Sequence, residues 1–150
     1  MIINQLKEDI IEDLKVCISY EQDKENDILC MMERYLKTKT NREKIKDSLR
    51  KLLNEEEYEN PFKVYYFYGQ KEICKFEEIL CDYIRKMDYH HDKAEVLGAT
   101  IFLINELHDR CSGELIDEWR KEKLEELLIL VAENVGFNTA TSIILSTKRW

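Results

Sequence analysis

Apolar residues recur at steps of three and four positions along most of the chain, with charged residues between them. This spacing places the apolar side chains on one face of an α-helix. The first such segment covers residues 2–19, and later ones cover residues 71–87, 93–111, 119–135 and 140–146. Two further helices are predicted between residues 27 and 53, the first of them carrying Ile28, Met31, Met32, Tyr35 and Leu36.

Capping residues support these helix ends. Asp27 can cap the second helix, and Thr40 with Glu43 forms a capping box for the third. Asp92 with Glu95 has the same spacing, whereas Gly113 and Gly136 follow the last apolar positions of their helices. Residues 62–68 have β composition, but their helical surroundings favour a helix or an irregular segment. The sequence therefore predicts an all-α protein, a single antiparallel bundle of six to eight helices.

Residues 1–150 are predicted to form one helical domain, because the chain has the length of one domain and enough apolar residues for one core. A subdomain seam could lie near residues 55–61, between an N-terminal three-helix part and the rest. Only four glycines and one proline are present, and neither a GxGxxG nor a GxxxxGK[ST] pattern occurs, which argues against a phosphate-binding loop.

Charged residues make up 36% of the chain, and the formal net charge is −8. The charges are unevenly distributed: residues 1–33 carry 3 bases and 9 acids, whereas residues 34–51 carry 8 bases and 2 acids. The basic stretch is the one feature that suggests nucleic acid. Because the whole chain is acidic and lacks a helix-turn-helix pattern, we expect a solvated helix face and no direct nucleic-acid binding.

Candidate chemistry is sparse. His90 and His91 are expected on an exposed turn beside a helix cap, without a metal ion. His108 and Cys111 could touch across one helical turn, but a mid-helix pair lacks an oxyanion hole. The five cysteines are odd in number and widely spaced, which is typical of reduced thiols in a cytoplasmic protein. No secretory signal or membrane span is expected, nor a cofactor, and the sequence favours a protein that is not an enzyme.

Two groups of residues favour protein binding. An acidic run is followed by a tyrosine-rich run, and tyrosines supply large contact areas with polar tips. A late helix also carries a row of acids, interleaved with Arg120, Lys121 and Lys123 on what we expect to be a solvated face. The predicted partner contacts are Glu55, Glu56, Glu57, Tyr58, Glu59, Tyr65, Tyr66, Tyr68, Asp117, Glu118 and Glu122.

From about residue 58 to residue 150 the chain resembles a family of small bacterial helical proteins of unknown function. The resemblance lies in Tyr65-Tyr66, Ile79-Leu80-Cys81, Ile104-Asn105-Glu106-Leu107, Gly136-Phe137 and Thr147-Lys148-Arg149-Trp150. It implies no activity. In size, acidity and helicity the chain is also similar to immunity proteins of bacterial contact-dependent growth inhibition, which neutralise a cognate toxin.

This similarity leads us to expect an immunity protein that occludes a basic toxin domain, plausibly a nuclease, since acids at the interface would speed association with a basic cleft. The alternative is a helical regulatory or adaptor protein. Such a protein could be a homodimer that associates through Met31 and Met32 or through the tyrosines.

Overall fold

The computed structural model describes residues 2–18, 32, 35–36, 39, 42–57 and 68–150, and these residues are all-helical without strands. The helices are α1 (Ile2–Ile18), α3 (Arg42–Leu53), α4 (Gln70–Tyr89), α5 (Lys93–Arg110), α6 (Glu118–Asn134) and α7 (Ala140–Thr147). The predicted fold class, a helical bundle of six to eight helices, is confirmed by these six described helices. Residues 58–67 lie outside the described part. The sequence left residues 62–68 ambiguous, and of these only Tyr68 is described.

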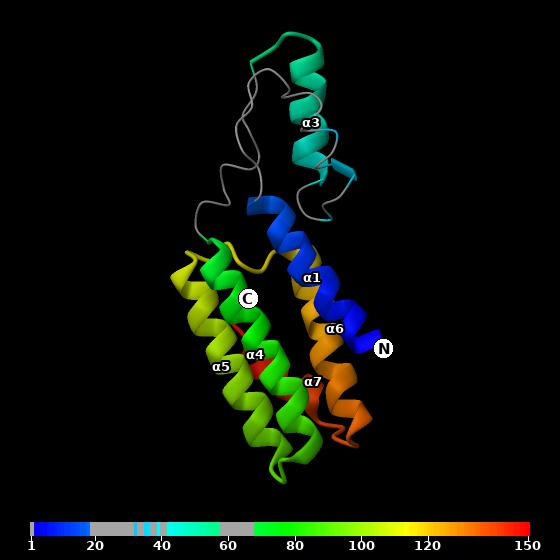
Figure 1. Cartoon of the computed structure of the whole chain (residues 1–150), viewed down its shortest axis with the longest axis vertical. Coiled ribbons are helices and arrows are strands. Elements are labelled where there is room, and N and C mark those ends of the chain that lie inside the picture. Colours follow the sequence, from blue (N-terminus) through cyan, green and yellow to red (C-terminus); the bar gives the residue numbers. More distant parts are fainter. Residues whose placement is uncertain (1, 19–31, 33–34, 37–38, 40–41, 58–67) are drawn as a thin grey trace.

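The bundle is built from α1, α4, α5 and α6, with the short α7 packed against α5 and α6 (Figure 1). Among the four long helices, the main pairs are α4 with α5, α1 with α6 and α1 with α4. The N-terminal helix therefore packs against helices from the C-terminal half of the chain. α3 lies beyond one end of this bundle, and the seam predicted near residues 55–61 falls largely outside the described residues.

One continuous core fills the bundle, and its buried side chains follow the predicted helical spacing. Phe76, Leu80 and Tyr83 on α4 are almost completely buried. The Tyr83 hydroxyl donates a hydrogen bond of 2.7 Å to the carbonyl oxygen of Leu128, which ties α4 to α6. Burial raises the pKa of Tyr83, so the hydroxyl stays protonated and remains a donor.

The helix ends agree with several sequence predictions. The Asp92 side chain caps α5 by accepting a hydrogen bond from the backbone N–H of Glu95. Gly136 adopts φ +76° directly after α6, a conformation that glycine adopts at low cost. The C-terminal segment is held by Asn105, whose amide donates to the carbonyl oxygen of Thr147 and accepts from the backbone N–H of Arg149.

Candidate functional site

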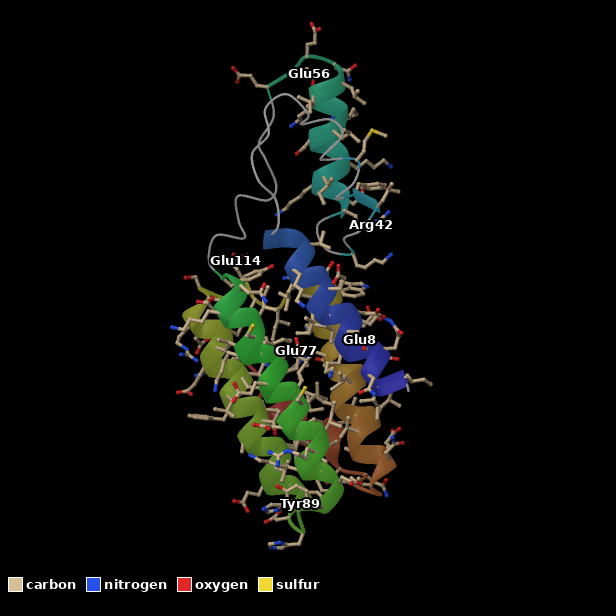
Figure 2. All side chains as sticks on the ribbon, viewed as in Figure 1. Glu8, Arg42, Glu56, Glu77, Tyr89 and Glu114 are labelled. Carbon is tan, nitrogen blue, oxygen red and sulfur yellow. The ribbon has the colours of Figure 1, made fainter. Side chains whose placement is uncertain are left out.

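The first predicted contact group lies at the far end of α3. Glu55, Glu56 and Glu57 are all exposed, and Figure 2 shows Glu56 at the extremity of the molecule. Tyr58, Glu59, Tyr65 and Tyr66 lie outside the described residues, so their predicted role stays a prediction. We call residues 55–57 the α3 tip.

Backbone hydrogen bonds hold the α3 tip in a defined shape. The N–H of Glu55 donates to the carbonyl oxygen of Leu52, and the N–H of Glu56 donates to that of Lys51. These two bonds make a Schellman motif, in which the residue after the C-cap takes a left-handed conformation. Glu55 occupies that position with φ +58°.

The same motif ends α6, with a different residue at the left-handed position. There the N–H of Gly136 donates to the carbonyl oxygen of Glu133, and the N–H of Phe137 donates to that of Ala132. A non-glycine residue in this conformation costs about 1–2 kcal/mol. In addition, carboxylates beside a helix C-terminus meet the negative end of the helix dipole. The acids of the α3 tip therefore lower the stability of the protein in two ways, through the left-handed conformation of Glu55 and through repulsion by the helix dipole.

Tyr68 does not fit its predicted role as a partner contact. Its side chain is only 4% exposed and packs in the core just before α4, with the guanidinium of Arg120 5.7 Å from the ring centroid. The sequence did not separate buried from exposed rings among residues 62–68. Packing against the bundle places Tyr68 inside it, so this ring offers almost no surface to a partner.

The second predicted contact group starts α6. Asp117 is the N-cap, and its Oδ1 accepts a hydrogen bond of 3.2 Å from the backbone N–H of Arg120. Glu118 and Glu122 are exposed. In Figure 2, Glu114 just before this group lies at the end of the bundle, well below Glu56 at the α3 tip. The two predicted groups therefore lie on separate surfaces. Within the second group, the Asp117 side chain caps the N-terminus of α6.

The expectation that Arg120 lies on a solvated face is wrong. Arg120 is 1% exposed, and its Nε lies 2.8 Å from Oδ2 of Asp13 on α1, which is itself buried. Asp13 Oδ1 also accepts a hydrogen bond of 2.7 Å from the backbone N–H of Lys39, and Arg120 donates to the carbonyl oxygen of Leu115. This buried pair joins α1, α6 and the segment before α3.

Sequence reasoning missed an acidic groove beside α1. The groove has a volume of about 440 Å³ and contains Glu8, Asp9 and Glu12 of α1 together with Glu77 of α4, and two lysines of α1. Figure 2 shows Glu8 and Glu77 on neighbouring helices of the same face. The acids of α1 were visible as its polar face, but the pairing of α1 with α4 is a tertiary feature that spacing does not encode.

His108 and Cys111 are both buried near the end of α5. His108 Nδ1 accepts a hydrogen bond of 3.2 Å from the backbone N–H of Ile116, and burial lowers the histidine pKa despite Asp109 and Glu114 nearby. Burial raises the pKa of the Cys111 thiol to about 11. A nucleophilic cysteine needs a lowered pKa, so this pair has the character of core residues.

The lowered pKa of His108 predicts a loss of stability in mild acid. As the pH falls below 6.5, the unfolded chain binds a proton at this position before the folded chain does, so the free energy of unfolding decreases. His108→Asn keeps an acceptor near the position of Nδ1 and should flatten the decline between pH 7 and pH 5.5 in urea unfolding. His91→Asn, at an exposed position, is the control. An unchanged slope in His108→Asn would contradict the assignment.

The other candidates remain on the surface. His90 and His91 stack at the turn between α4 and α5 with ring centroids 4.9 Å apart, as expected for turn histidines. Within residues 2–18, 42–57 and 68–150, no group of three His, Cys, Asp or Glu side chains is placed to hold a metal ion. On α3, Arg50 and Lys51 pair with Asp47 of the same helix, and these two cations lower the Asp47 pKa.

In comparisons with known proteins, no family model matches the chain, and no curated protein or solved structure is significantly similar to it. None of the described helices is long and apolar enough to cross a membrane.

Proposed function

We propose that this protein is an immunity protein that binds a basic bacterial toxin domain, such as a nuclease, and neutralises it by occlusion. The α3 tip is the observation that carries the proposal. Glu55 takes a left-handed conformation there, which favours glycine, and three exposed carboxylates follow the C-terminus of α3, where basic residues would be more stable. Residues whose strained conformation lowers the stability of a protein occur most often at functional sites.

The charge of the bundle supports a basic partner. Residues 2–18 and 69–150 contain 20 acids and 13 bases, a net charge of −7. A field of this sign attracts cationic surfaces over several ångströms and raises the rate of association. A nuclease domain presents such a surface, because its substrate is a polyanion.

The first experiment is co-expression with the product of the adjacent upstream gene. We expect that product to be toxic alone, and we expect this protein to restore growth and to co-purify with it. A non-toxic neighbour with no association would contradict the proposal and favour a different class of partner.

The α3 tip can be tested against a matched surface. Glu55, Glu56 and Glu57 changed together to Lys should lower the association rate constant about tenfold or more and weaken its salt dependence, because the steering charge is reversed. Association is measured by stopped-flow fluorescence at several salt concentrations.

The matched control changes Glu8, Glu12 and Glu77 of the acidic groove to Lys. It alters the net charge by the same +6 but leaves the α3 tip intact. We expect the control triple to slow association far less. Equal slowing by both triples would show that net charge alone steers the partner, and would remove the α3 tip as its contact.

A regulatory or adaptor protein, in homodimeric form, is the second candidate. It is favoured by exposed apolar side chains, namely Met32 at 47%, Leu36 at 72% and Phe102 at 58% exposure. A homodimer would cover such groups. Light scattering of the purified chain separates the two candidates, since a stable dimer without a basic partner supports the second.

A further inference from the structure

A cleft of about 360 Å³ lies between the first turns of α4 and the last turn of α5. Its volume is at the lower end of the range for small-molecule sites. It is lined by Lys71, Glu72, Cys74, Lys75, Glu78, Leu107 and Arg110. Although the protein as a whole is acidic, three cations from two helices meet here.

The carboxylates of the cleft are already engaged. Oε2 of Glu72 accepts a hydrogen bond of 3.0 Å from the backbone N–H of Gly69, the N-cap residue of α4. Oε2 of Glu78 lies 4.0 Å from Nζ of Lys75, so these two groups largely offset each other. Among the residues that the structure describes, neither Lys71 nor Arg110 forms an ion pair.

We propose that this cleft binds a small organic anion, a carboxylate or phosphate ester with a short apolar body, held between Lys71 and Arg110. The guanidinium of Arg110 can contact two oxygens of such a head group at once, and Lys71 adds a second cation from the facing helix. The positive end of the α4 dipole lies beside the same position. Leu107 is almost completely buried, so the methylene stems of Lys71 and Arg110 provide most of the apolar contact for the ligand body.

Cys74 makes the occupancy of the cleft measurable. Its thiol is free, exposed and part of the lining, whereas Cys81 is also free and exposed but lies two turns further along α4, outside the cleft. Alkylation of each cysteine by iodoacetamide can be followed separately by peptide mass spectrometry. Cys81 then serves as an internal control on the same helix.

The probes are phenyl phosphate and benzoate, with phenol as the neutral match. At a probe concentration about ten times its Kd, the empty fraction falls to roughly one tenth, so Cys74 should react about tenfold more slowly. Cys81 should react at an unchanged rate, and phenol should protect neither thiol. Lys71→Gln with Arg110→Gln, both at exposed positions, should abolish the protection.

Any of four results would overturn the proposal. Three of them are no protection of Cys74 by either anion, equal slowing of Cys74 and Cys81, and protection that persists in the Lys71→Gln, Arg110→Gln variant. Protection by phenol as strong as that by phenyl phosphate would likewise show that the cleft selects for an aromatic ring and not for an anion.

Discussion

Arg120→Met should lower the free energy of unfolding by about 3–5 kcal/mol, the usual cost of removing one partner from a buried ion pair. Asp13 would then remain in the core without the Arg120 guanidinium, which now lies 2.8 Å from its carboxylate. Met has a similar length and little polarity, so the change tests the charge and not the volume. Urea unfolding followed by circular dichroism measures the effect.

An exposed ion pair of the same chemistry provides the control. Arg85 and Asp82 lie 3.1 Å apart on α4, with the Arg85 side chain 62% exposed. Arg85→Met should change stability by about 0–1 kcal/mol, as is typical of surface pairs. A double-mutant cycle with Asp13→Asn should show strong coupling to Arg120→Met. Equal effects of the two arginine substitutions would contradict the burial of the Arg120 pair.

Phe76→Ala should destabilise the protein by about 3–5 kcal/mol, because it removes a buried ring and leaves a cavity. Phe76 is 1% exposed and packs in the core between α4 and its neighbours. Thermal and urea unfolding measure the loss. Since the helix itself tolerates alanine well, the result reports packing and not helix propensity.

Phe102→Ala is the matched control on α5. Its ring is 58% exposed, so truncation should cost about 0.5 kcal/mol or less. If Phe102→Ala instead destabilised the chain as much as Phe76→Ala, the outer face of α5 would be buried in solution. That result would support the homodimeric alternative.

The features that were predicted correctly from the sequence depend on residues close together in the chain. The spacing of Ile73, Phe76 and Leu80 predicted α4, and the Asp92–Glu95 box and Gly136 marked helix ends that the structure confirms. Each signal acts within one or two turns: a side chain reaches its own backbone, or neighbouring positions share a face. Local rules of this kind do not depend on which helices later pack together.

The errors share one cause. Arg120 was expected on a solvated face, the charged residues of α1 on its polar face, and Tyr68 among the partner contacts. The structure buries Asp13 of α1, Arg120 and Tyr68. A charged side chain is buried only when a partner reaches it, and here the partners are 107 positions apart. No periodicity within one helix carries that information.

The candidate site also has one part that the sequence predicted and another that only the tertiary structure showed. The sequence alone placed acids at residues 55–57 and indicated a basic partner from their charge. It gave no sign that Glu55 takes the left-handed position of a Schellman motif, because most chains reserve that position for glycine. The acidic groove and the α4–α5 cleft were equally hidden, since each combines residues from two helices.

The sequence by itself thus determined the helical class, most helix boundaries and the acidic character of this protein, because helix formation and net charge depend on residues close in the chain. Tertiary structure decided which charges are buried as a pair, which ring joins the core and which cations face one cleft. These properties depend on how helices pack, and packing depends on the complementary shapes of whole faces.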